Sequence, residues 1–349
     1  MSRLRLLVLV VGPIPIVLGS FGLSRLLKPA AAPRAEHNHV VAAHQQALLP
    51  MLAEGRPTTG QRFESGPTPD GGLPRFLVAD PLERACDREA DTWQELLGPD
   101  CAVVVRPPFV VAGDLSEDQL VAWHRHTIEP AARAMAAAYF PQRPTAPVTV
   151  LLFSGEPSYE HYAKTLFADT GVSIYGYYKR GQRVLVMNIA TGGGTLVHEL
   201  THALADFDCP QIPDWLNEGL ASLHEQCRFR ADGRGIDGLV NWRLPKLQEA
   251  IRHDRLRSLA SLVGDDNFRD HDIGLNYAQA RYFCMFMDSR GQLQDFFRRW
   301  RAARKSDPLA VTAVRDTFAG SDWETIDREY REWVLTLTWL VAPPTPPSE

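Results

Sequence analysis

The residues best suited to chemistry lie in one short segment, residues 195–204, which reads Thr-Leu-Val-His-Glu-Leu-Thr-His-Ala-Leu. In a helix, His198 and His202 lie one turn apart on the same face, which suits two nitrogen ligands of a single tetrahedral Zn²⁺. Glu199 is rotated by roughly 100° around the helix, so its carboxylate can reach a zinc-activated water without binding the metal. Most of the other positions are apolar, which indicates a buried helix whose polar side chains need partners. The pattern predicts a zinc hydrolase with Glu199 as the general base.

A catalytic zinc site needs a third protein ligand and leaves its fourth position to water. The best candidate is Glu218, within residues 213–221, which read Pro-Asp-Trp-Leu-Asn-Glu-Gly-Leu-Ala. The chain between His202 and Glu218 is long enough for one helix to end, a loop to turn and a second helix to pack against the first. A carboxylate among apolar residues is costly unless it meets a cation. The alternative is an exposed Glu near a helix N-terminus, stabilised by the helix dipole.

The two segments together resemble the gluzincin zinc metallopeptidases, and they are most similar to peptidase-MA-like proteins of bacterial genomes. Residues 198–203 also match the thermolysin motif letter for letter. The resemblance covers residues 176–287, roughly a third of the chain. It implies a zincin-like fold in which His198, His202 and Glu218 hold one Zn²⁺ and Glu199 is the general base. It also implies that residues 183–189 form the edge strand that pairs with an extended peptide.

The sequence departs from the thermolysin-like pattern at Ser222. That pattern has an Asp four residues after the glutamate ligand, where it orients a zinc histidine, and Ser222 stands there instead. Asp206, four residues after His202, matches another acidic position of the pattern and is a candidate for the same role. A zinc-bound histidine needs such an acceptor, but the sequence does not identify which residue supplies it.

Peptide hydrolysis also needs a hydrogen-bond donor for the developing oxyanion. In gluzincin aminopeptidases a Tyr at a helix start polarises the carbonyl, and Tyr277 is similarly placed. Packing at a domain edge is the alternative for Tyr277, and His224 and His271 are further donor candidates. These aminopeptidases hold the free N-terminus with a Gly-x-Met-Glu-Asn segment. Here residues 186–189 read Val-Met-Asn-Ile, without the Glu, which argues against a plain aminopeptidase.

The elements that must position these residues predict an α+β fold, with a small mixed sheet, an edge strand beside the active-site helix, and a helical lobe after it. A capping box at Ser116-Glu117-Asp118-Gln119 opens a helix that runs to residue 140, and Thr195 is a candidate N-cap for the motif helix. Strands are expected at 101–106, 147–153, 174–178 and 183–189, the last two joined by a hairpin turn at 179–182. Further helices are expected at 81–97, 156–169, 213–226, 244–253, 256–263, 276–287, 292–304, 309–319 and 323–337.

The N-terminus resembles an export signal. Arg3 and Arg5 precede an apolar run over residues 6–23, and small residues follow at 30–32. The run is almost long enough to span a bilayer, so the segment is either a cleaved signal or a membrane anchor, with a buried core helix as the alternative. Either form of export places the rest outside the cytoplasm, in the periplasm or secreted.

Four regions are therefore expected along the chain. They are a signal peptide or anchor plus linker at 1–34, an N-terminal region of unknown role at 35–113, a zincin-like catalytic domain at 114–342, and a disordered tail at 343–349. A helix is expected at residues 36–55 within the second region.

Composition limits the partners. The chain of 349 residues is 45% hydrophobic and 23% charged, which is ordinary for a globular protein. A net charge of -5 and the absence of a basic stripe argue against nucleic acid. Five cysteines fit an oxidising compartment. Cys86 with Cys101, and Cys209 with Cys227, are candidate pairs, and Cys284 is expected in the core.

These features predict an exported zinc metallopeptidase that acts on a peptide or protein substrate. A second hypothesis is a zincin-fold module of the cell envelope that binds or scaffolds without turnover. The intact set of ligands and base weighs against it, because a binding module needs no base. A third hypothesis is hydrolysis of a non-protein amide, such as a cell-wall peptide cross-link.

Overall fold

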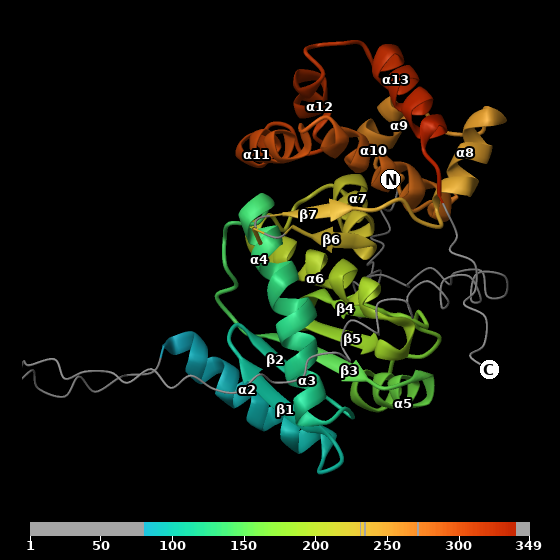
Figure 1. Cartoon of the computed structure of the whole chain (residues 1–349). Coiled ribbons are helices and arrows are strands. Elements are labelled where there is room, and N and C mark those ends of the chain that lie inside the picture. The colour runs from blue at the N-terminus through green and yellow to red at the C-terminus, as the bar shows by residue number, and fades with distance from the viewer. Residues whose placement is uncertain (1–79, 231, 234, 271, 340–349) are drawn as a thin grey trace, which may run out of the picture. The chain divides into compact units, whose positions relative to one another are not determined.

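Residues of high β-propensity build a mixed five-stranded sheet at the centre of the fold. The computed structural model describes residues 80–230, 232–233, 235–270 and 272–339. The strands are β1 (Ala102–Arg106), β2 (Phe109–Gly113), β3 (Val148–Phe153), β4 (Gly176–Lys179) and β5 (Val184–Asn188). They lie in the order β1-β2-β3-β5-β4 (Figure 1). The pairs β2–β3 and β3–β5 are parallel, and the outer pairs β1–β2 and β4–β5 are antiparallel.

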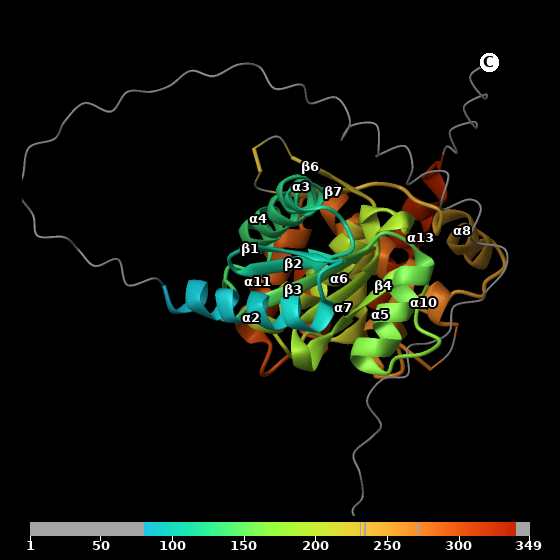
Figure 2. The same cartoon turned by 90° about the horizontal axis from the view of Figure 1, so that it is seen from below.

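Helices cover both faces of this sheet. They are α2 (Pro81–Leu97), α3 (Glu117–Trp123), a π-helical turn (His124–Ile128), α4 (Glu129–Ala138), α5 (Glu156–Phe167) and α6 (Gly193–Asp208). Strand side chains alternate between the faces, so in β3 Val150 and Leu152 join the core with α4 and α6, whereas Leu151 and Phe153 join the core with α2 and α5. Figure 2 shows α2 and α5 along one side of the strands and α3 and α4 along the other.

The rest of the described chain is mainly helical. Its elements are α7 (Asp214–Glu225), β6 (Cys227–Phe229), β7 (Ile236–Gly238), α8 (Leu244–Arg252), α9 (Leu259–Gly264), α10 (Ile273–Ser289), α11 (Leu293–Ala303), α12 (Val311–Thr317) and α13 (Trp323–Thr336). Helix α7 packs between α6 and α10, and α8, α11 and α13 also contact α10. The short strands β6 and β7 form a separate antiparallel pair. Among the residues described, no helix is both long and apolar enough to cross a membrane.

Most predicted elements are confirmed, and the mixed α/β architecture with a helical C-terminal part is as expected. The capping box is present, because the Ser116 side chain accepts from the Gln119 backbone and the Gln119 side chain accepts from the Ser116 backbone. The predicted hairpin is β4–β5, which turns through a short 3₁₀ segment at Arg180–Gln182. Thr195 is not the N-cap of the motif helix, since α6 begins at Gly193 after Gly192.

The prediction that residues 183–189 form the edge strand is wrong. Residues 183–189 contain β5, which lies inside the sheet between β3 and β4. The reason is topological: α5 connects β3 to the hairpin, and the second arm of the hairpin then pairs parallel with β3. The first arm, β4, is left on the outside. The edge strand beside α6 is therefore β4.

The predicted region boundary between residues 113 and 114 falls within the sheet. Strand β2, which the sequence analysis did not predict, pairs with β3 along its whole length. Helix α2 packs on the same sheet. Residues 80–113 therefore form part of the layer that supports the site, and all described residues belong to one compact unit.

The five cysteines are all free, so neither candidate disulfide is formed. Cys101 instead makes a 3.2 Å contact with the Tyr162 hydroxyl. Cys284 lies in the core, as expected. The predicted export segment, the helix at 36–55, His271 and the tail at 343–349 lie outside the described residues.

Gly219 permits the close approach of α7 to α10. A Cβ at this position would lie 2.8 Å from Cys284 Sγ and 2.9 Å from the backbone oxygen of Ala280. We therefore expect Gly219→Ala to lower the free energy of unfolding by about 1–3 kcal/mol, because the helices must separate. Urea unfolding measures this change. Gly264→Ala is the control, since nothing lies within 4 Å of its Cβ position. Equal stability of the two variants would contradict tight packing at Gly219.

Candidate metal centre

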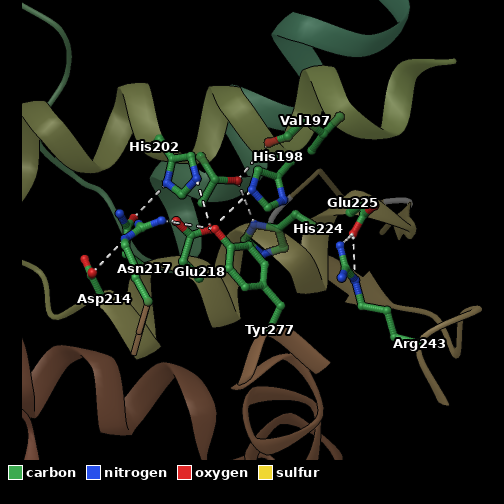
Figure 3. A network of polar contacts seen from close by, with 12 residues as sticks. Val197, His198, His202, Asp214, Asn217, Glu218, His224, Glu225, Arg243 and Tyr277 are labelled. Carbon is green, nitrogen blue, oxygen red and sulfur yellow. Dashed lines mark hydrogen bonds and ion pairs between the residues drawn. The ribbon is translucent and has the colours of Figure 1, made fainter. Parts of the chain in front are cut away.

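Helix α6 presents two imidazole rings on one face. Leu196, Leu200 and Ala203 are completely buried and hold the opposite face of the helix on the core. The rings of His198 and His202 are consequently neighbours, with centroids 4.9 Å apart and planes at 80°. Both rings face α7, which packs directly against α6 (Figure 3). The two histidines, four residues apart on a helix, thus place their rings side by side, as predicted.

Glu218 on α7 completes the group. Its side chain is only 5% exposed, and its Oε2 lies 3.4 Å from His198 Nε2 and 3.5 Å from His202 Nε2. One ligand atom from each of the three residues lies within 4.8 Å of the others. Figure 3 shows the carboxylate directed at both rings. The structure therefore brings together all three residues that the sequence analysis selected as metal ligands.

The surroundings of Glu218 Oε2 indicate whether this group fits a metal. The atom is buried, and it has no hydrogen-bond partner among the described residues. The two imidazole Nε2 atoms, at 3.4 and 3.5 Å, are too distant for strong hydrogen bonds, and a buried carboxylate oxygen without one costs free energy. A cation placed between Oε2 and the two imidazole nitrogens would satisfy all three atoms. Two histidines and one glutamate are also a known ligand set of catalytic zinc, which keeps a fourth position open. The residues present therefore fit a zinc ion.

Electrostatic coupling within the group is strong. Burial lowers the pKa of His202, but Glu218 and Glu199 outweigh it and raise the pKa to about 9. Burial raises the pKa of Glu218, yet His202 and His198 hold it well below its ordinary value. The carboxylate therefore stays ionised beside an imidazole that holds a proton. Because a metal binds only deprotonated imidazole nitrogen, metal binding here must release a proton.

The acceptor that orients His202 is Asn217. His202 Nδ1 lies 3.0 Å from Asn217 Oδ1, so with Nε2 free to bind a metal the Nδ1–H donates to the amide oxygen. Neither candidate from the sequence has this role. Asp206 forms an ion pair with Arg180 at 2.6 Å, and Ser222 Oγ is buried without a partner in the described chain. Asn217 directly precedes Glu218, and this adjacency was the one signal available in the sequence.

Glu199 lies beside the metal-ligand group without belonging to it. Its carboxylate is half-buried and accepts a hydrogen bond from the backbone N–H of Tyr178 in β4. Burial raises the pKa of Glu199, and the nearby histidines only partly offset this. The side chain is thus placed between the two histidines and the edge strand, as a base acting at the metal would require.

Tyr277 reaches the same group from α10. Its hydroxyl lies 3.3 Å from Arg269 Nη1 and close to the Glu218 carboxylate. Burial is the main cause that raises the pKa of Tyr277 above its ordinary value, so the hydroxyl keeps its proton. Arg243, which pairs with Glu225 at 3.1 Å, lies over the ring at 5.7 Å. Figure 3 shows this pair on the His198 side of the site.

Arg269 is a functional candidate that the sequence analysis missed. Its guanidinium donates to Glu218 Oε1 at 2.6 Å and to Asp214 Oδ2 at 2.8 Å. It lies in the connection between α9 and α10, more than fifty residues after Asp214. No local pattern marks it, because only the packing of α10 on α7 brings this connection to the site.

His224, a donor candidate from the sequence, lies beneath α6 rather than in the group. It is completely buried, and its Nδ1 lies 3.1 Å from Thr201 Oγ1. The Thr201 hydroxyl donates to the Val197 carbonyl at 2.8 Å, so it accepts from His224 Nδ1–H. His224 therefore helps to hold the motif helix through Thr201.

We expect the metal-free protein to lose stability in acid partly through His224. Burial, with help from Arg281 and His198, lowers the pKa of His224 from 6.5 to about 3. Between these values the unfolded chain holds a proton that the native state lacks. The free energy of unfolding should fall by up to about 1.4 kcal/mol per pH unit as pH decreases through this window.

Urea unfolding at about pH 7 and about pH 5, with a chelator present, measures this slope. In His224→Gln the contribution of the histidine is absent, so the free energy of unfolding should differ less between the two pH values. Other buried groups titrate alike in both proteins and cancel in the comparison. Equal pH dependence in both proteins would show that His224 is not held neutral by the fold.

No family model matches the chain, and no curated protein matches it. The family resemblance therefore stays a prediction, carried by two short motifs. The arrangement of side chains at the site does not depend on that resemblance. Residues from α6, α7 and α10, together with Arg269, converge on one buried carboxylate.

Proposed function

We propose that this protein is a zinc-dependent hydrolase, most consistent with a peptidase, and that His198, His202 and Glu218 hold one zinc ion. The observation that carries the proposal is Glu218 Oε2, a buried oxygen without a hydrogen bond that faces both imidazole Nε2 atoms. A zinc ion bound there would lower the pKa of water and polarise a carbonyl. The segments around His198 and Glu218 also support a gluzincin-type, zincin-like fold, and the basic and apolar N-terminal segment supports export, as parts of this proposal.

Glu199 is the proposed general base. It is adjacent to His198 in the chain but outside the ligand group, so its carboxylate remains free to exchange a proton. The Tyr178 N–H fixes this carboxylate on the side of the edge strand, where a substrate would lie. Glu199 would accept a proton from the attacking water and deliver it to the leaving nitrogen. Its partial burial raises its proton affinity, which favours both transfers.

Tyr277 is the proposed donor to the developing oxyanion. Its hydroxyl stays protonated and lies beside the ligand Glu218, where Arg269 also contacts it. A donor that is already oriented stabilises the charge that forms on the carbonyl oxygen without reorganising. Tyr277 would thus act on the substrate from the side of α10, while Glu199 acts from the side of α6.

The position of β4 at the edge of the sheet supports a peptide as the substrate. The Asn188 N–H donates to the Tyr175 carbonyl, so in this antiparallel pair the backbone groups of Gly176 and Tyr178 point away from β5. The Tyr178 N–H donates to Glu199, which leaves the Tyr178 carbonyl and the Gly176 groups for a peptide. An extended peptide that adds to this edge would therefore run past the proposed base. This edge takes the place that the sequence analysis gave to residues 183–189.

Turnover by the full chain tests the proposal. A mixture of peptides with blocked and free ends should be cleaved, a chelator should abolish the cleavage, and added zinc should restore it. Cleavage of peptidoglycan fragments alone would favour hydrolysis of cell-wall amides. Zinc binding without turnover of either substrate would favour the non-catalytic envelope module.

A further inference from the structure

Arg269 joins the proposed metal ligand to two other groups of the site. Its Nη2 lies 2.6 Å from Glu218 Oε1, its Nε 2.8 Å from Asp214 Oδ2, and its Nη1 3.3 Å from the Tyr277 hydroxyl. Each of the three guanidinium nitrogens thus has a different acceptor. The Arg269 side chain is 40% exposed, so part of it faces solvent while its nitrogens contact these three residues.

The two oxygens of Glu218 consequently have different surroundings. Oε1 accepts the short bond from Arg269, and Oε2 faces His198 and His202. A carboxylate that is free to rotate can bind a metal through one oxygen or through both. With Oε1 engaged by a charge-assisted hydrogen bond, only Oε2 remains for a metal. Arg269 therefore determines which oxygen of Glu218 is available to bind a metal.

Asp214 fixes the guanidinium on its other side. Asp214 and Glu218 are four residues apart on α7, so they lie on the same face of the helix. Arg269 spans this turn and also reaches Tyr277 on α10. The guanidinium thus ties the helix of the ligand to the helix of the proposed oxyanion donor.

We propose that Arg269 is a positioning residue that restricts Glu218 to binding the metal through Oε2 and holds the Tyr277 hydroxyl in the site. This inference rests on the proposed function, since it concerns the same metal. Arg269 itself does not contact the substrate or the metal. It acts through Glu218 and Tyr277.

Arg269 also affects metal affinity through its charge, and this effect is opposite in sign to the effect of positioning Glu218. A guanidinium beside a metal cation repels it, so loss of Arg269 could strengthen metal binding. Asp214 lies 2.8 Å from Arg269 and offsets that charge. The geometric effect should therefore dominate, because loss of an outer partner of a metal ligand lowers metal affinity by about 10–100-fold.

The test uses the full-length chain with zinc itself as the probe, measured by competition with a chromophoric chelator. Arg269→Met should bind zinc about 10–100-fold more weakly than the parent. Arg269→Lys keeps the charge but not the planar fork, so it should recover only part of the affinity. Asp214→Asn, which leaves Glu218 and Arg269 in place, should show a smaller loss. Arg255→Met is the control, since Arg255 pairs with exposed Glu249 at 2.9 Å.

A spectroscopic measurement separates positioning from a general loss of structure. With Co²⁺ in place of zinc, the visible absorption reports the number and arrangement of ligands. If Glu218 in Arg269→Met binds through both oxygens, the bands should shift and weaken, whereas Arg255→Met should match the parent. Thermal unfolding of the metal-free proteins checks that Arg269→Met is folded.

Tyr277 provides a kinetic measurement of the same inference. If Arg269 orients the Tyr277 hydroxyl, the losses in kcat from Arg269→Met and Tyr277→Phe should not multiply in the double variant. Unchanged zinc affinity and cobalt spectrum in Arg269→Met would overturn the inference, as would tighter zinc binding. If the parent binds zinc and cleaves peptide while Arg269→Met equals it in both, the inference alone fails. If the parent binds no zinc, the proposed function fails with it.

Discussion

Glu199→Gln should retain its zinc and lose about 10²–10⁴-fold in kcat. Glutamine keeps the size of the side chain, but its amide cannot accept and deliver a proton. Because Glu199 does not belong to the ligand group, metal binding should be preserved. Steady-state peptide cleavage, paired with the zinc content of the same sample, measures both quantities.

The matched control is Glu160→Gln on α5, an exposed glutamate outside the ligand group. Its kcat should equal that of the parent, which shows that removing a carboxylate elsewhere has no effect. Zinc-loaded Glu199→Gln that cleaves as fast as the parent would refute the role of Glu199 as base. Such a result would leave the metal site itself intact.

Glu218→Gln should abolish stable zinc binding. This carboxylate supplies the one negative charge in the ligand group, and its Oε2 lies within 3.5 Å of both imidazole nitrogens. A ligand that binds only the native state stabilises it by about 4 kcal/mol at a concentration of about 1,000 times its Kd. The parent should therefore gain about this amount when zinc is added to chelator-treated protein, and Glu218→Gln should gain almost nothing.

Glu225→Gln is the control for this prediction. Glu225 is a mostly buried glutamate on the same helix, paired with Arg243 at 3.1 Å, and it is not one of the ligand group. It should retain the stabilisation by zinc. Thermal unfolding with and without zinc compares the proteins. A full zinc-dependent increase in the Tm of Glu218→Gln would show that the metal binds elsewhere.

The parts of the site that sequence could predict are those encoded locally. His198, Glu199 and His202 lie within five consecutive residues, so helical periodicity alone places them. Glu218 sits among apolar residues, which marks it as buried and in need of a cation. The capping box at Ser116 likewise acts over three residues, and it is present as predicted.

The parts that sequence could not predict depend on contacts between distant segments. Arg269 meets Glu218 only because α10 packs on α7, an approach that Gly219 permits. Asn217 was adjacent to a predicted ligand, but an Asn beside a Glu on a helix is ordinary. Its role follows only from the direction of the His202 ring.

The order of strands was likewise inaccessible from local pattern. Both β4 and β5 read as strands, and the hairpin between them was predictable from its turn. Which arm faces outward depends on the parallel pairing of β5 with β3, which α5 makes possible. The same holds for β2, whose short apolar run is a strand because it pairs with β1 and β3.

The central claim is that one zinc ion is held by His198, His202 and Glu218, and X-ray absorption at the zinc edge tests it most directly. The purified full chain should contain about one zinc, bound only by nitrogen and oxygen at about 2.0–2.1 Å. The result is decisive because the chain has five free cysteines, none of which belongs to the ligand group. Sulfur neighbours at about 2.3 Å, or zinc far below one ion per chain, would contradict the account.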